Sequence, residues 1–175
     1  ATQVAERELQ RLVGKYGRGQ VTKGMEEVQN YVERAVRQRI ADLPDGTWEA
    51  VDYIDRDPGA GEGMIPIHIK MTIKGDQIVY DFEGSHPTIS SIYNSAHGAT
   101  FSAVVAGMKT FFPDLPLNSG FYRMVDVRAP KNSVVSAEWP VAVTGFLMPF
   151  EKIMNAIFEM WSQIMPDRAI ACAFN

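Results

Sequence analysis

Cysteine is nearly absent from the 175-residue chain, which contains a single one, Cys172. One thiol excludes an intramolecular disulfide, and a thiol-poor composition fits a reducing compartment, so we predict a cytoplasmic protein. No neighbour of Cys172 in the sequence is a recognisable base that would activate the thiol. We therefore interpret Cys172 as a buried, inert thiol.

Long apolar runs are also lacking. The first 20 residues are interspersed with charges, unlike a signal peptide. The most apolar stretch, residues 141–165, is interrupted by Glu151, Lys152 and Glu159, so it does not predict a membrane span. The formal net charge of −4 gives no electrostatic reason to expect nucleic acid or an anionic membrane as a partner.

The motifs of common nucleotide-binding and hydrolytic sites are missing as well. The chain contains no G-x-x-x-x-G-K-[ST], H-E-x-x-H or G-x-S-x-G. The acidic, glycine-rich segment 55–62 fails the spacing of an EF-hand, because Gly59 takes its fifth position and Pro66 stands where the bidentate glutamate is needed. Its glycines do not match G-x-G-x-x-G either, so we interpret the segment as a solvated connector.

Hydrophobic residues make up 46% of the chain and charged residues 22%, as in globular proteins.

Helical periodicity dominates the first quarter of the chain. Apolar residues recur at helical spacing over residues 3–16 and again over 20–42. Gly17 and Gly19 separate the two segments, and Pro44 ends the second. The pattern predicts a helical hairpin over residues 1–42, whose apolar stripes need a partner surface.

A period of two then replaces the helical period. Residues 47–55 are predicted to form a strand, and residues 64–82 a β-hairpin with a turn at Gly75. A two-residue turn pairs Ile73 with Ile78, Met71 with Tyr80, Ile69 with Phe82 and Lys70 with Asp81. A slip by one residue would place every apolar side chain opposite a polar one, so the sequence specifies one register.

The remaining pattern completes an α+β fold. A helix rich in small residues is expected at 98–112, a strand at 122–128, and a deeply buried helix from Pro149 to Met165. We predict the helical hairpin at 1–42, followed by an α+β region at 43–175 with an antiparallel β-meander and two further helices packed on the sheet. Because residues 169–175 read as the start of a buried strand, we expect a piece of a longer protein that is incomplete at this end.

Candidate site residues gather in the polar loop after the hairpin. The candidates are Asp81, near the end of the hairpin, and His86, Asn94 and His97, in the loop of residues 83–97 that follows it. Three of them, Asp81, His86 and His97, supply enough ligands for a metal site in principle, but their spacing does not require one. The alternative is that His86 caps the loop through hydrogen bonds and His97 begins a helix. We assign no catalytic residue and no metal ligand from the sequence.

Four segments in order resemble the B-type subunit of the hydantoinase/oxoprolinase family, which includes the large subunits of acetone and acetophenone carboxylases. They are residues 43–53 (LPDGTWEAVDY), 75–85 (GDQIVYDFEGS), 115–123 (LPLNSGFYR) and 127–133 (VRAPKNS). The preceding helical pair also matches the family's layout, so the resemblance covers nearly the whole chain.

This resemblance implies a role in an ATP-dependent complex. In the family, an A-type subunit activates a lactam or ketone carbonyl by phosphorylation. The B-type subunit then completes hydrolysis or carboxylation, with a divalent metal in some members. ATP and the metal are thus expected for the whole complex and not for this segment, because the family's Gly-Gly-Thr-His motif is absent here. The apolar stretch 143–150 (VTGFLMPF) leans toward the carboxylases.

The resemblance leads us to expect a central segment that acts as scaffold and subunit contact. Its expected partners are the ATP-binding A-type subunit, the rest of its own chain and a small lactam or ketone substrate. Two alternatives are a non-catalytic protein-interaction module that uses the stripe of residues 3–42, and a small metal-dependent hydrolase that uses Asp81, His86 and His97.

Overall fold

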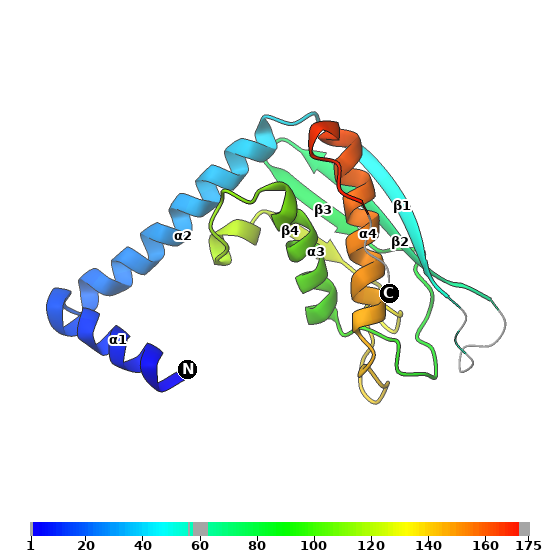
Figure 1. The fold of residues 1–175 in the computed structure, drawn as a ribbon, viewed down its shortest axis with the longest axis horizontal. Helices are drawn as coiled ribbons and strands as arrows, with labels where there is room; N and C mark the ends of the chain where they lie inside the picture. Colours follow the sequence, from blue (N-terminus) through cyan, green and yellow to red (C-terminus); the bar gives the residue numbers. More distant parts are fainter. Residues whose placement is uncertain (1, 56, 58–62, 172–175) are drawn as a thin grey trace.

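The computed structural model describes residues 2–55, 57 and 63–171, so Cys172, the terminal residues 173–175 and most of the connector 55–62 lie outside the described residues. An elongated helical arm leads into a body in which two helices cover one face of a four-stranded sheet (Figure 1). The predicted α+β class is therefore confirmed, with the two N-terminal helices preceding the strands.

The strands are β1 (Gly46–Ile54), β2 (Ile65–Lys74), β3 (Gln77–Asp81) and β4 (Val125–Arg128), in the sheet order β1-β2-β3-β4. The hairpin between β2 and β3 has the predicted register, with Ile73 opposite Ile78 and Lys70 opposite Asp81. Gly75 takes a φ of 58° in its turn, a left-handed conformation that suits glycine. β1 pairs antiparallel with β2, which extends the antiparallel part of the sheet.

The last strand differs from the prediction of an antiparallel meander. β4 pairs with β3 in parallel, so the sheet is mixed. The chain leaves β3 and returns to its edge through α3 (His97–Phe111), and a crossover of this length places the two strands in the same direction. Tyr122, which we expected to begin the strand, instead ends a short 3-10 helix, η1 (Ser119–Tyr122).

The core lies between the sheet and the two helices α3 and α4 (Leu147–Ile164), after which a short 3-10 turn, η2 (Pro166–Arg168), follows. The inward side chains of β2 alternate with partly exposed ones and are buried. Burial of each such side chain contributes about 1.5–3 kcal/mol. α3 and α4 approach closely, as a Cβ added to Gly107 would lie 2.8 Å from the Ile157 side chain. The predictions of a closely packing helix and a buried last helix are therefore confirmed.

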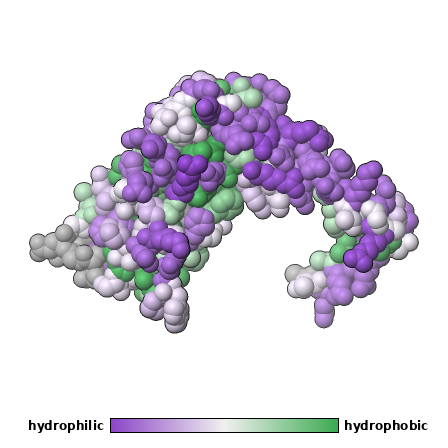
Figure 2. Space-filling model, turned by 180° about the vertical axis from the view of Figure 1, so that it is seen from behind, coloured by the Kyte–Doolittle hydropathy of each residue, from purple (hydrophilic) through white to green (hydrophobic). Residues whose placement is uncertain are grey.

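The arm consists of α1 (Thr2–Tyr16) and α2 (Arg18–Ala41), which meet at Gly17. α2 begins two residues earlier than expected, since Gly17 alone, with a φ of 80°, makes the bend. No residue of α1 is buried, and the buried residues of α2, Val32, Val36 and Ile40, all lie in its C-terminal half. The view from behind shows the arm reaching away from the body as a hook, with apolar atoms exposed at its bend (Figure 2).

Ionic and hydrogen-bonding contacts fasten the C-terminal half of α2 to the body. The Arg123 guanidinium donates to Glu33 Oε2 at 2.9 Å, and also to Gln29 and Asn30. Arg37 bonds to Glu33 Oε1 at 2.9 Å, as the i, i+4 spacing predicts, and to Asp76 at 3.1 Å. The hydrogen bond from Arg123, followed by that from Arg37, lowers the pKa of the Glu33 carboxyl below its ordinary value.

Candidate functional site

Two of the four predicted site residues lie on the wall of one open pocket. The parallel strands β3 and β4 end side by side, with Asp81 opposite Arg128, and α3 begins at His97 beside them. The pocket measures about 450 Å³ and is lined by Asp81, Glu83, His97, Val127, Arg128, Ala129 and Pro130. The parallel pairing therefore brings together residues from three separate elements.

The polar groups of this pocket are mostly engaged with near neighbours. Asp81 Oδ1 accepts a hydrogen bond from the Glu83 backbone N–H at 3.0 Å. Arg128 is paired with Asp126 at 2.7 Å. His97 is exposed, and in the described part of the chain no hydrogen bond joins it to Asp81 or Glu83. The pocket can receive a small polar molecule, but among the described residues that line it no nucleophile is hydrogen-bonded to a base.

His86 does not line this pocket. Its ring Nδ1–H donates to the Pro87 carbonyl at 2.7 Å, and its backbone N–H donates to the Pro66 carbonyl at 3.0 Å. Its carbonyl in turn accepts from Val134 N–H at 2.8 Å. His86 therefore ties the loop to the start of β2 and to the segment around Val134, as the loop-capping interpretation expects.

Asn94 is completely buried and organises the loop from within. Its Oδ1 accepts from the Ile89 backbone N–H at 2.9 Å. Its Nδ2 donates to the carbonyls of Ile89, Ser91 and Ala142, at 3.0, 2.9 and 3.1 Å. These four bonds occupy the side chain, so Asn94 holds the loop together and does not face a ligand.

The fit of a metal ion to these residues can be judged directly. Across residues 2–55, 57 and 63–171, no three His, Cys, Asp or Glu side chains are grouped so that they could hold one. The arrangement thus gives no support to a ligand set of Asp81, His86 and His97, and we derive no metal-dependent step from this chain.

None of the described helices is long and apolar enough to cross a membrane.

A smaller polar pocket, which sequence reasoning missed, lies between β1 and α4. It measures about 280 Å³ and is lined by Val51, Asp52, Lys152, Asn155, Ala156 and Glu159. Asp52 Oδ2 accepts from Asn155 Nδ2 at 3.2 Å, and Lys152 Nζ lies 3.9 Å from Asp52 Oδ1. The signal in the sequence that could have revealed this pocket is Asp52, a charged residue among the inward-facing positions of β1.

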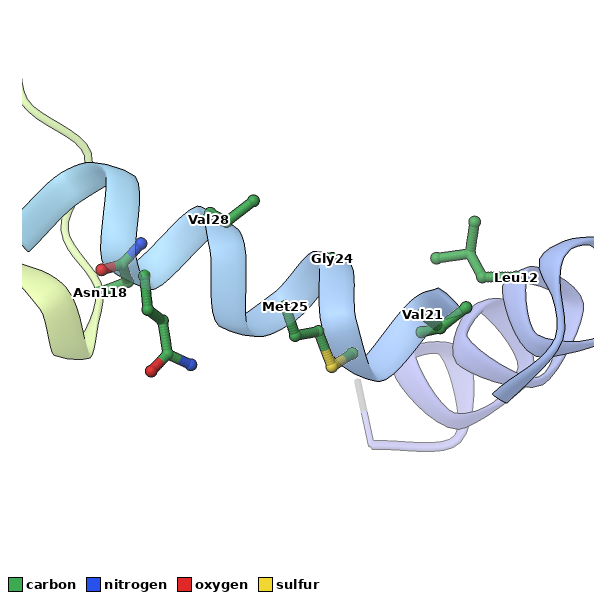
Figure 3. Close-up of a pocket in the computed structure, with 7 residues that line it drawn as sticks. Leu12, Val21, Gly24, Met25, Val28 and Asn118 are labelled. Atoms are coloured by element: carbon green, nitrogen blue, oxygen red, sulfur yellow. The ribbon is translucent and has the colours of Figure 1, made fainter. Parts of the chain in front are cut away.

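An apolar groove of about 440 Å³ opens on the arm. It is lined by Leu12, Val21, Gly24, Met25, Val28, Gln29 and Asn118. Figure 3 shows Gly24 on the surface of α2 between Val28 and Leu12. The expectation that the stripe of residues 3–42 needs a partner surface rested in part on its apolar side chains, of which Leu12, Met25 and Val28 are exposed by 37–57%.

A comparison with protein-family models identifies the family to which this mixed sheet with its helical arm belongs. The family model of hydantoinase B/oxoprolinase matches residues 1–175, and the chain belongs to this family.

A caprolactamase and an acetophenone carboxylase are among the proteins that resemble the chain. It is 30% identical to caprolactamase subunit beta of Pseudomonas jessenii over 98% of its own length and 30% of that protein. The crystal structure of ATP-dependent caprolactamase from the same organism matches 95% of this chain and 29% of that one, with a TM-score of 0.84 and 30% identity. The acetophenone carboxylase delta subunit of Aromatoleum aromaticum is 26% identical over 76% of this chain and 20% of its own.

A nucleotide-free structure of acetone carboxylase shares the fold, with a TM-score of 0.80 at 21% identity over 91% of this chain and 23% of that one. The chain thus spans less than a third of the length of each of these relatives. The family resemblance inferred from the four sequence segments is therefore confirmed.

Proposed function

We propose that this chain is a central segment of a B-type subunit in an ATP-dependent complex that hydrolyses lactams or carboxylates ketones. Within the complex it serves as scaffold and subunit contact, and the reacting groups, ATP and a divalent metal are held elsewhere. The observation that carries this proposal is the similarity to ATP-dependent caprolactamase along almost the whole chain, at 30% identity and a TM-score of 0.84.

The geometry of the segment supports the scaffold role. Asn94 and His86 are engaged in holding the loop, and the pocket at Asp81 and His97 lacks a nucleophile beside a base. The exposed apolar groove of the arm supports the role in subunit contact, because a contiguous exposed apolar surface marks an interaction site. The proposed partners are an ATP-binding A-type subunit and further parts of the same polypeptide, in the cytoplasm.

The test compares the purified 175-residue chain with the complete native subunit combined with its ATP-binding partner. Each is assayed for ATP hydrolysis and for turnover of caprolactam, hydantoin, 5-oxoproline and acetone with bicarbonate. We expect ATP-dependent turnover of a lactam or a ketone by the complete complex, none when ATP is left out, and none by the chain alone. Turnover by the chain alone would overturn the proposal.

The exposed groove also favours a second candidate, a non-catalytic interaction module. The length of the native gene product distinguishes the two. A polypeptide of several hundred residues that includes this segment supports the subunit, whereas a reading frame that ends near residue 175 supports the module.

A further inference from the structure

A polar stripe runs along α4 beside β1, the outermost strand of the described sheet (Figure 1). Lys152, Asn155 and Glu159 recur at i, i+3 and i+7, so they lie on one face of the helix. They line the pocket of about 280 Å³ together with Val51, Asp52 and Ala156. Most other residues of α4 are apolar and packed in the core, so hydrophobic burial does not account for this stripe.

The backbone of Val51 adds a donor and an acceptor to the pocket. Val51 lies opposite His68 of β2. The backbone N–H of His68 donates to Ser85 Oγ, and the carbonyl of His68 accepts from the same hydroxyl, both at 3.1 Å. Opposite residues of an antiparallel pair either bond to each other or both face away. Because His68 turns its backbone groups toward Ser85, the N–H and C=O of Val51 lie on the free edge of the sheet.

Asp52 is already engaged in holding the floor of the pocket. Its Oδ1 accepts from the Tyr53 backbone N–H at 2.7 Å, and its Oδ2 accepts from Asn155 Nδ2 at 3.2 Å. Lys152 Nζ lies 3.9 Å from Oδ1, a separation too long for a hydrogen bond. The carboxylate therefore attracts the Lys152 ammonium to the pocket without satisfying its donors.

Two charged groups at the pocket are available to a ligand. Only 21% of the Lys152 side chain is exposed, and its ammonium makes no hydrogen bond within residues 2–55, 57 and 63–171. Glu159 is exposed and makes no ion pair with any of these residues. A charge that is mostly withdrawn from water is stabilised by a further partner. The two residues are seven positions apart, which corresponds to about 10 Å along the helix axis.

A zwitterion with well-separated charges matches this arrangement. Its carboxylate can accept from Lys152 and from the free N–H of Val51, while its ammonium donates to Glu159. An α-amino acid carries both charges on one carbon atom and therefore spans much less of the distance between Lys152 and Glu159. A simple anion or a simple cation satisfies only one of the two groups.

We propose that the pocket between β1 and α4 binds a linear ω-amino acid, with its carboxylate on Lys152 and its ammonium on Glu159. Hydrolysis of a lactam adds water across the ring C–N bond and leaves a carboxylate and an amine at opposite ends of one chain. The ligand is thus the class of product that lactam hydrolysis releases, and the inference rests on that form of the proposed function. The pocket holds this product apart from the reacting groups, which we place elsewhere in the complex.

The first experiment measures binding by isothermal titration calorimetry, with the 175-residue chain and with the complete native subunit. The probe is 6-aminohexanoate. Its isomer 2-aminohexanoate, hexanoate and hexylamine are the comparison ligands, because each lacks either one charge or the separation of the charges. We expect 6-aminohexanoate to bind with a Kd lower than that of each comparison ligand by about tenfold or more, as one additional charge-assisted hydrogen bond predicts.

The second experiment assigns the two ends of the ligand. Lys152→Gln should weaken 6-aminohexanoate and hexanoate by about tenfold, because both place a carboxylate on this side chain. Glu159→Gln should weaken 6-aminohexanoate and hexylamine by a similar factor and leave hexanoate unchanged. Lys131→Gln and Glu138→Gln are the matched controls, since they remove one exposed cation and one exposed anion that do not line the pocket. The controls should leave every Kd unchanged.

The inference is wrong if neither protein binds 6-aminohexanoate, if 2-aminohexanoate binds equally well, or if neither pocket variant weakens binding. Binding by the 175-residue chain that is lost in the complete subunit would also overturn it, because another segment would then fill the pocket. The readouts separate the two proposals. ATP-dependent lactam turnover without binding of 6-aminohexanoate refutes the pocket alone, and binding without any ATP-dependent turnover refutes the proposed function alone.

Discussion

Asn94 shows how one buried side chain can organise a whole loop. It makes four hydrogen bonds to the backbone, three of them within residues 89–91 and one to Ala142, 48 residues away. Such a residue looks like a candidate ligand in a sequence, because it is polar and surrounded by loop residues. In the structure every one of these bonds is internal, and the amide is fully buried.

We therefore expect Asn94→Ala to destabilise the fold by about 3 kcal/mol, because it leaves several buried backbone groups without partners. The free energy of unfolding in urea measures the effect. Asn30→Ala is the control, since Asn30 bonds to Arg123 at the surface and its loss should cost less than about 1 kcal/mol. Equal effects of the two changes would contradict the assigned role of Asn94.

Tyr80 and Trp161 form a second buried polar contact, in which the indole Nε1–H donates to the Tyr80 hydroxyl at 2.9 Å. Burial raises the pKa of this hydroxyl above its ordinary value, although the bond from Trp161 lowers it in part. The folded state therefore keeps the proton while the unfolded chain loses it near pH 10. Stability from this group is present below about pH 10 and is lost as the pH rises further.

The measurable outcome is a difference between two pH profiles of the unfolding free energy. Between about pH 10 and 11.5, the original chain should lose stability faster than Tyr80→Phe, by up to about 1.4 kcal/mol per pH unit. At neutral pH the variant should be less stable by about 1–3 kcal/mol, since the Trp161 N–H loses its partner. Parallel profiles in the alkaline range would show that Tyr80 ionises as freely when folded.

At the scale of residues, the sequence predicted the place of a residue in a helix or strand better than the groups that the residue contacts. The helical pattern after His97 placed that residue at the start of α3, and the alternation of the hairpin placed Asp81 one residue before the expected end of its strand at Phe82, whereas β3 ends at Asp81 itself. The roles of His86 and Asn94 depend on Pro66, Val134 and Ala142, which lie far away in the sequence. No local pattern encodes those contacts.

At the scale of elements, two glycines differ in whether the packing around them leaves room for a side chain. Gly120 of η1 lies against the α2 backbone, and an added Cβ would be 2.0 Å from the Gln29 oxygen. Gly98 lies in the first turn of α3, and an added Cβ would meet nothing within 4 Å. The two positions form a matched pair for the same substitution.

Gly120→Ala should destabilise the protein by about 1–3 kcal/mol, because α2 and η1 must separate to admit the methyl group. Gly98→Ala should be neutral or stabilising by up to about 1 kcal/mol, since alanine narrows the unfolded ensemble and fits the helix. Thermal and urea unfolding of both variants measure the difference. A neutral Gly120→Ala would mean that η1 does not pack on α2 as described.

The hairpin and the crossover differ in how far the sequence could define them. The register of β2 and β3 follows from alternation and a two-residue turn, both of which are local. The direction of β4 depends on the path of α3 over the sheet, and a short strand pattern is the same in either direction. Parallel pairing therefore became visible only with the structure.

For the whole molecule, stability should be distributed unevenly between arm and body. α1 buries no residue, whereas β2, β3 and α4 contribute many of the fully buried side chains. Helices of about 15 residues are marginal without tertiary packing. In hydrogen exchange on the monomeric chain, we expect amides of α1 to exchange fastest and those of β2 and α4 slowest. Protection of α1 equal to that of β2 would contradict this order.

The network around Arg123 also gives α2 the properties of a lever. This network acts as the pivot and holds only the C-terminal half of α2. The whole helix has 24 residues and is about 36 Å long. The N-terminal end of α2, Arg18, lies 15 residues or about 22 Å from Glu33, so a tilt of about 10° at the pivot moves that end by about 4 Å. Small rearrangements of Glu33, Arg37 and Arg123 would thereby be converted into larger displacements of the exposed end of the arm, so a few side chains at the pivot would set where that end lies.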